Sequence, residues 1–144
     1  MPTIRRFEDL EIWQAARAQC IAVNKLIEST PLKNDFSLRD QVTRSSGSVM
    51  DNIAEGFDRF TRKDFRHMLT IARGSNAEVR SQLYRMLDKG YLEQDIADQV
   101  IKSNIRLSVK ITNLISHLSK TSITSKSIMD KKETLEEPAS IYGL

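Results

Sequence analysis

Apolar residues recur at three- and four-residue spacing in four long stretches of the chain, which is the pattern of amphipathic helices. These stretches cover about residues 8–30, 37–57, 61–89 and 93–120. Pro31 stops the first stretch, and Gly90 is placed to end the third as a left-handed residue, with Tyr91 as its apolar companion. Long helices joined by short connections predict an all-α fold, an antiparallel up-down-up-down four-helix bundle.

Polar residues at the predicted starts suit the first turn of a helix. Asp9 is the expected N-cap of the first helix. Ser37 with Asp40, and Thr61 with Asp64, resemble capping boxes in which Asp replaces Glu. These residues predict where the first three helices begin.

The apolar positions also predict which face of each helix points inward. On the first helix the favoured stripe is Leu10, Trp13, Arg17, Cys20, Asn24 and Ile27, widened by Ile12, Ala16, Val23 and Leu26. On the second helix it is Leu38, Val42, Ser45, Val49, Asn52 and Gly56, with Ile53 beside them. The third helix has one row of Phe65, Ala72, Val79 and Met86, and an adjacent row of Leu69, Asn76 and Leu83. The fourth has a seam of Ile96, Val100, Leu107, Ile111, Leu114 and Leu118.

Two features exceed what a single bundle needs. Ile101, Ile105 and Ile115 form a second apolar edge on the fourth helix, and residues 45–48 form a patch of small side chains on the second. Surplus apolar surface is typical of contact between subunits. We therefore expect the chain to associate with itself.

Composition fits this fold and indicates a compartment. Only 5 Gly and 3 Pro occur among 144 residues, which favours a few long elements over a turn-rich sheet. The single cysteine, Cys20, forms no internal disulfide, and neither a secretory apolar region nor an apolar run of about 18 residues is present. We expect a cytoplasmic protein with no membrane contact. Residues 1–120 are expected to form the bundle, and the Ser-, Thr-, Lys- and Glu-rich residues 121–144 a disordered polar tail.

The sequence offers no pattern typical of a metal centre or an active site. His67 and His117 lie on different predicted helices, and neither belongs to an HExxH or Glu-x-x-His pair. Cys20 falls on an apolar stripe, and no glycine-rich phosphate loop is present. We therefore expect no metal, no cofactor, no catalytic residue and no enzymatic activity.

The distribution of basic residues is more informative than the net charge of +3. Residues 59–89 carry eight Lys or Arg against three acids. Four arginines in this segment are seven positions apart and form one ridge if Arg59 is helical, because a heptad drifts only about 20° on a straight helix. The candidate phosphate-binding residues are Arg59, Arg62, Lys63, Arg66, Arg73 and Arg80. A second ridge on the fourth helix consists of Lys102, Arg106 and Lys110.

The sequence leaves two interpretations of these arginines open. In the first, the ridge binds the phosphates of RNA or DNA. In the second, it is a solvated face, or it pairs with acids of a neighbouring helix or subunit. Asp40, Asp51, Glu55 and Asp58 on the second helix are available for such pairing.

Two short motifs carry a resemblance to a known family. These are Asn-Ile-Ala-Glu-Gly at residues 52–56 and Ile-Ala-Arg-Gly-Ser at residues 71–75, followed by Glu78 and Gln82. Over about residues 7–118 the chain resembles the bacterial four-helix bundle family also called the 23S rRNA intervening-sequence proteins. The resemblance implies an antiparallel bundle that assembles as a homopentamer, some members being encoded within insertions in large-subunit ribosomal RNA genes. A distant relative, the accessory protein of diversity-generating retroelements, implies nucleic acid and a reverse transcriptase as further partners.

The motif residues also have a physical interpretation. Glu55 is expected to be buried and paired with the Arg-rich start of the third helix, beside Asn52, while Gly56 permits a sharp exit from the second helix. Gly74, next to Ser75, is either a tolerated glycine or a point of close backbone approach. The predicted function is a non-enzymatic oligomeric bundle that binds RNA or DNA. The alternative is a structural or protein-interaction module whose arginine ridge seals subunit interfaces.

Overall fold

Four α-helices form the protein, as the apolar pattern predicts. The computed structural model describes residues 3–59, 61–120 and 135–136. The helices are α1 (Glu11–Ser29), α2 (Phe36–Asp58), α3 (Arg62–Asp88) and α4 (Gln94–Ser119). Two short 3-10 helices, η1 (Phe7–Asp9) and η2 (Pro31–Asn34), precede α1 and α2. Two-residue strands, β1 (Thr3–Ile4) and β2 (Leu135–Glu136), pair antiparallel. Otherwise the predicted tail, residues 121–144, lies outside the described residues.

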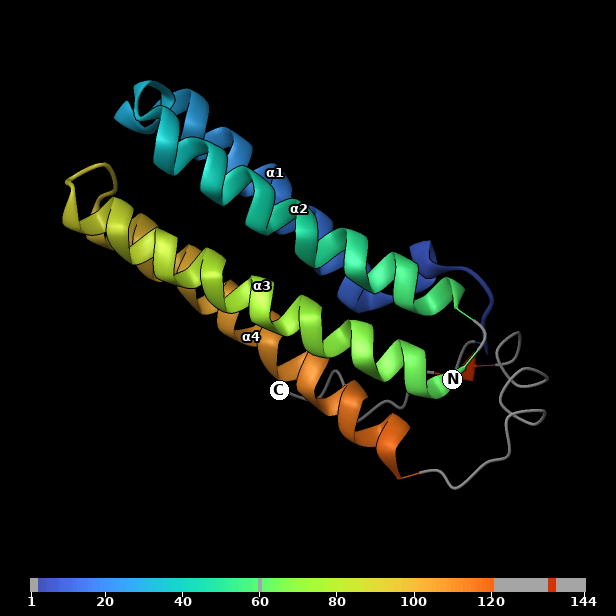
Figure 1. The fold of residues 1–144 in the computed structure, drawn as a ribbon. Helices are drawn as coiled ribbons and strands as arrows, with labels where there is room; N and C mark the ends of the chain where they lie inside the picture. Colours follow the sequence, from blue (N-terminus) through green and yellow to red (C-terminus); the bar gives the residue numbers. More distant parts are fainter. Residues whose placement is uncertain (1–2, 60, 121–134, 137–144) are drawn as a thin grey trace.

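The helices are arranged as two hairpins packed against each other. Figure 1 shows α1 beside α2 in one layer and α3 beside α4 in the other. Side-chain contacts give the directions of α2 and α3, because residue numbers rise on one helix as they fall on the other. Gln41 meets Arg85, Ser45 meets Glu78 and Ser48 meets Ser75. The α2–α3 pair is therefore antiparallel, as predicted.

The α1–α4 pair follows the same rule. Gln19 contacts Asn104, whereas Glu11, earlier on α1, contacts Lys110, later on α4. Both seams between the two hairpins are therefore antiparallel, and the up-down-up-down arrangement follows.

Two of the three predicted N-cap residues are wrong, although the helices begin within three residues of the predicted positions. Asp9 lies in η1, and α1 begins after Leu10, which makes no side-chain cap. The cap of α2 is Asp35 and not Ser37, because η2 carries the chain directly into the helix and the Asp35 Oδ1 accepts the Leu38 N–H at 3.3 Å. Thr61 is confirmed as a cap.

Both ends of α3 have the local bonds that its sequence predicts. The Asp64 N–H donates to the Thr61 Oγ1 at 3.0 Å. At the other end Gly90 has a φ of 77°. The Tyr91 N–H donates to the Met86 carbonyl and the Gly90 N–H to the Leu87 carbonyl, each at 2.9 Å. These two bonds form a Schellman motif, which needs the left-handed residue that glycine supplies.

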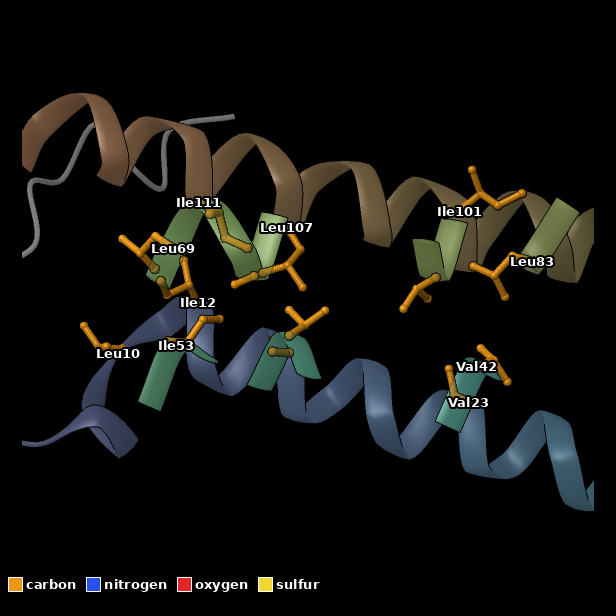
Figure 2. Packing of buried hydrophobic residues seen from close by; sticks show 14 of the residues in the cluster. Leu10, Ile12, Val23, Val42, Ile53, Leu69, Leu83, Ile101, Leu107 and Ile111 are labelled. Atoms are coloured by element: carbon orange, nitrogen blue, oxygen red, sulfur yellow. The ribbon is translucent and has the colours of Figure 1, made fainter. Parts of the chain in front are cut away.

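The core fills the space between the two layers. Both predicted rows of α3 are buried along their whole length. Figure 2 shows apolar side chains from all four helices converging there, with Ile12, Ile53, Leu69 and Ile111 toward one end and Val23, Val42, Leu83 and Ile101 toward the other.

The predicted inward face of α1 is rotated from the observed one. The buried residues are Ile12, Ala16, Gln19, Val23 and Leu26. Arg17 and Asn24, which the prediction placed on the stripe, are exposed. The main reason is that α1 packs on α2 and α4 together, so its buried face is centred between both neighbours. The residues expected only to widen the stripe therefore form its centre.

Much of the surplus apolar surface is used inside the chain. Ile101 is buried, Ile115 packs against the core, and Ser45 and Ser46 are buried along the seams of α2. Ile105 stays 43% exposed, and Ile96, predicted to lie in the seam, is 42% exposed. These two features therefore leave less apolar surface for subunit contact than the sequence predicts.

Candidate nucleic-acid interface

The predicted ridge of four arginines is a row of three. Arg59 lies beyond the end of α2 with an extended backbone, φ −77° and ψ 156°. Its N–H closes α2 by bonding to the Glu55 and Gly56 carbonyls. Its guanidinium donates to the Glu55 carboxylate at 2.7 Å. Because Arg59 is not helical, the heptad spacing does not place it on the ridge.

Arg66, Arg73 and Arg80 remain together on α3, and we call them the α3 arginine row. The Arg73 Nη1 donates to the Thr112 Oγ1 at 3.4 Å, so the row lies on the side of α3 that borders α4. The heptad spacing keeps Arg66 and Arg80 on that side. Each of the three is half-buried. A rise of about 1.5 Å per residue spreads the row over roughly 20 Å.

The α3 arginine row is not neutralised within the described part of the chain. Neither Arg66 nor Arg80 makes a side-chain hydrogen bond or ion pair with a described residue. The helix that carries the predicted acidic partners, α2, packs on the opposite side of α3, the side on which Glu78 contacts Ser45. Asp40 and Glu55 pair instead with Arg39 and Arg59. Pairing of the row with α2 of the same chain is therefore excluded by position.

The remaining two candidates of the basic segment lie on different faces. Arg62 is half-buried near the end of α4, and burial lowers the pKa of its guanidinium. Burial also lowers the pKa of His117, and the positive charges of Arg62 and Lys120 lower it further. Lys63 is exposed on the next face of α3. The structure therefore groups Arg62 with the row and sets Lys63 apart from it.

The ridge on α4 is partly neutralised. Lys102 and Arg106 are exposed. Lys110 forms an ion pair with Glu11 of α1, with 2.6 Å between the Nζ and Oε1 atoms. Lys110 therefore links α4 to α1. Of the three residues in this ridge, Lys102 and Arg106 remain accessible to a ligand.

The two hairpins differ in charge. Residues 3–59 carry eight Lys or Arg and nine Asp or Glu, whereas residues 61–120 carry eleven against six. No acidic residue occurs from Gln99 to Lys120. The positive charge of the bundle is therefore concentrated on the α3–α4 hairpin, which carries the arginine row.

The motif residues join α2 to α3. The Asn52 Nδ2 donates to the Ser48 carbonyl at 2.7 Å and to the Ser48 Oγ at 2.9 Å, and that hydroxyl lies 2.9 Å from the Ser75 Oγ. Gly56 allows close packing, since a Cβ there would lie 2.7 Å from the Met68 Cβ. The prediction of a sharp exit at Gly56 is wrong, because α2 continues to Asp58.

Glu55 and Gly74 also differ from the simplest expectation. The Glu55 side chain is 54% exposed and pairs with Arg59, so it is not the buried charge that the sequence suggested. A Cβ on Gly74 would meet no atom within 4 Å. Close approach at Gly74 therefore requires another molecule.

The sequence does not predict two groups of residues that the structure brings together. One is a hydrogen-bonded set of buried amides, Gln19, Asn76 and Asn104, at the centre of the core. The other is a polar groove of about 370 Å³ between α2 and α3, lined by Gln41, Arg44, Ser45, Ser48, Ser75, Glu78 and Gln82. The sequence clue to the groove is Ser45 and Ser48, which lie one turn apart on α2 beside its apolar stripe.

Among the described residues, no three His, Cys, Asp or Glu side chains gather closely enough to hold a metal ion. Cys20 is half-buried, and burial raises the pKa of its thiol. None of the described helices is both long enough and apolar enough to cross a membrane.

Comparison with known proteins gives a family and a fold. The family model of the 23S rRNA-intervening sequence protein matches residues 8–113. A crystal structure of a protein of unknown function from the S23 ribosomal protein family of Bacteroides thetaiotaomicron is similar, with a TM-score of 0.65 and 21% identity. The similarity covers 76% of this chain and 99% of that one. No curated protein matches significantly.

Proposed function

Because this chain belongs to the 23S rRNA-intervening sequence protein family, we propose that it is a non-enzymatic oligomeric bundle that binds RNA or DNA in the bacterial cytoplasm. The observation that carries the proposal is the α3 arginine row, which no described acid of the chain neutralises. Unpaired cations spread along about 20 Å of helix suit a phosphate backbone, which attracts positive charge without regard to base sequence.

The rest of the α3–α4 hairpin supports the same proposal. Its excess of Lys and Arg raises the local concentration of a polyanion near the row. Few large aromatic side chains are available there for base stacking, so we expect binding that depends on phosphates and varies little with sequence. A reverse transcriptase is a further candidate partner. The oligomer that we propose is a homopentamer of this chain.

The test replaces Arg66, Arg73 and Arg80 together by Gln and measures RNA binding by fluorescence anisotropy. Gln keeps helix propensity, so the bundle is expected to fold normally. The matched control replaces Arg17, Lys25 and Lys33 by Gln, which removes the same charge from exposed positions of the other hairpin. We expect the first variant to lose affinity and the control to retain it. Equal affinities for both variants would contradict the proposal.

A second candidate function is a structural module in which the α3 arginine row seals subunit interfaces. Two helix glycines favour it, of which Gly74 is exposed and Gly47 half-buried. Gly47 and Gly74 each cost helix stability, and a Cβ at either would meet no atom of the described chain. Gly47 lies near the acidic Asp40 and Asp51 on α2, so another copy could bring acids to the row. Light scattering on the triple Arg variant distinguishes the two functions, because only an interface role predicts dissociation.

A further inference from the structure

The polar groove between α2 and α3 has no part in the proposed nucleic-acid interface. It lies on the side of α3 that faces α2, whereas the α3 arginine row lies on the side that borders α4. The groove is nevertheless the place where the two motif segments meet, since Asn52, Ser48 and Ser75 are linked by hydrogen bonds at one end of it. Its volume of about 370 Å³ falls within the range of small-molecule sites.

Among the described residues, one hydroxyl hydrogen in this groove has no acceptor. Ser48 and Ser75 share a single hydrogen bond of 2.9 Å, in which either oxygen can be the donor. The Asn52 amide donates to the Ser48 oxygen and so takes up no hydroxyl hydrogen. Of the two hydroxyls, one therefore keeps an unused O–H, whichever way the pair is oriented.

The Gln82 amide adds further unused hydrogen-bonding capacity. Its residue is only 7% exposed, and it makes no side-chain hydrogen bond within the described part of the chain. Buried amides in proteins are normally bonded. The wall of the groove therefore offers hydrogen-bond donors beyond those that the fold itself uses.

Opposite charges stand on the two walls of the groove without pairing. Arg44 of α2 and Glu78 of α3 both line it, and no ion pair joins them. Arg44 makes no side-chain hydrogen bond with a described residue, and Glu78 accepts only a long bond of 3.4 Å from Ser45. A ligand with one positive and one negative group would satisfy both charges at once.

We infer that this groove binds a small zwitterion of the α-amino-acid class. The ligand ammonium pairs with the Glu78 carboxylate, and the ligand carboxylate pairs with the Arg44 guanidinium. The hydroxyls of Ser48 and Ser75 supply neutral hydrogen bonds at one end of the groove, and the Gln82 amide supplies them from the α3 wall. This inference stands apart from nucleic-acid binding, because none of these residues belongs to the α3 arginine row.

The test is a calorimetric titration of the intact chain with each standard amino acid. Methylammonium and acetate, each carrying only one of the two charges, serve as comparison probes. We expect saturable binding of at least one amino acid at millimolar concentration or below, and none of either probe. No saturable binding by any amino acid would overturn the inference, as would equal binding of a single-charge probe.

Matched variants locate the site. Glu78→Gln and Arg44→Gln each remove one charge from an exposed position, so the bundle is expected to remain folded. Each is expected to weaken amino-acid binding by about tenfold or more. Glu28→Gln and Arg17→Gln remove the same charges from exposed positions of α1 and are expected to have no effect. Equal losses in the groove and control variants would place the ligand elsewhere and contradict the inference.

Discussion

At the residue scale, Asp35 joins the two loops at one end of the bundle. Its Oδ1 caps α2 by accepting the Leu38 N–H. Its Oδ2 accepts the Lys89 ammonium at 2.7 Å and the Tyr91 hydroxyl at 2.9 Å, both just beyond the end of α3. The bonds from Lys89, Tyr91 and Leu38, in that order of effect, lower the pKa of the Asp35 carboxyl. One side chain therefore couples the α1–α2 and α3–α4 connections.

This coupling predicts a pH dependence of stability. Because the pKa of Asp35 is lower in the folded than in the unfolded chain, its contribution is complete above the unfolded pKa of 3.8. The contribution is lost as pH falls through that value toward the folded pKa. Asp35→Asn should lower the Tm at neutral pH and reduce the further fall in Tm on acidification. Thermal unfolding at neutral and acidic pH measures both changes.

The control for this prediction is Asp40→Asn, which removes an exposed carboxylate whose ion-pair partner in the described part of the chain is Arg39. We expect it to leave the Tm at neutral pH nearly unchanged, since exposed ion pairs contribute little. A similar fall in Tm for both variants would show that Asp35 has no special role.

At the element scale, three buried amides relate the helices to one another. The Gln19 Nε2 donates to the Asn76 Oδ1 at 2.9 Å, and the Asn104 Nδ2 donates to the Gln19 Oε1 at 2.8 Å. The Asn76 Nδ2 donates to the Asn104 carbonyl at 3.0 Å. These bonds connect α1, α3 and α4 at one level of the core, and a shift of any helix by one turn would break them. We therefore regard the amides as fixing helix register.

The amide set predicts an asymmetric response to substitution. Asn76→Leu leaves the buried Gln19 Nε2 without its acceptor and the Asn104 carbonyl without its side-chain donor, so we expect a loss of about 2–4 kcal/mol in the free energy of unfolding. Replacing all three residues by Leu removes every unpaired amide and should recover part of that loss. Urea denaturation of both variants checks the order. A triple variant less stable than Asn76→Leu would contradict it.

A second prediction at this scale concerns the stability changes when three helix glycines are replaced by Ala. A Cβ at Gly56 would contact Met68 and Phe65 closely, so Gly56→Ala should lower the free energy of unfolding by about 1–3 kcal/mol. Gly47→Ala and Gly74→Ala meet no atom and should raise the stability of the single chain by up to about 1 kcal/mol each. Urea denaturation at low protein concentration measures all three. Equal effects at the three positions would contradict the packing found at Gly56.

The sequence predicts where the helices lie along the chain better than it predicts which face of each helix is buried. The rows of α3 and the residues at its two ends are local patterns, and the structure confirms them. The face of α1 is different, because both the stripe with Trp13 and Cys20 and the stripe with Ile12 and Val23 have helical spacing. Only the positions of the neighbouring helices decide between the two stripes. Gln19 also makes the buried face of α1 harder to identify, since a buried amide has the same hydropathy as an amide on the surface.

The candidate site shows the same limit. Heptad spacing correctly grouped Arg66, Arg73 and Arg80, because spacing alone determines the side of one helix. It failed for Arg59, whose place depends on where α2 ends. The position of Glu55 at the end of an apolar stripe predicts burial, but the residue lies in the last turn of α2 on an exposed face. The α2–α3 groove requires two helices to be aligned and could not be read from either one.

At the scale of the whole molecule, the division of charge between the hairpins is the feature that bears on function. The α1–α2 hairpin is nearly balanced, whereas the α3–α4 hairpin has a clear positive excess and an acid-free stretch from Gln99 to Lys120. Such an arrangement gives one side of the bundle a positive field, which attracts polyanions and steers their approach. The central claim is that the α3 arginine row makes direct phosphate contacts within this field.

The salt dependence of RNA binding tests that claim most directly, because each phosphate contact contributes a fixed share to the slope of log K against log salt concentration. For single-stranded RNA we predict that replacing Arg66, Arg73 and Arg80 by Gln lowers the magnitude of this slope by about 2, close to 0.7 per lost contact. The Arg17, Lys25 and Lys33 control, with the same net charge, should keep the slope of the unmodified chain. An unchanged slope in the first variant, or the same decrease in both, would contradict the account.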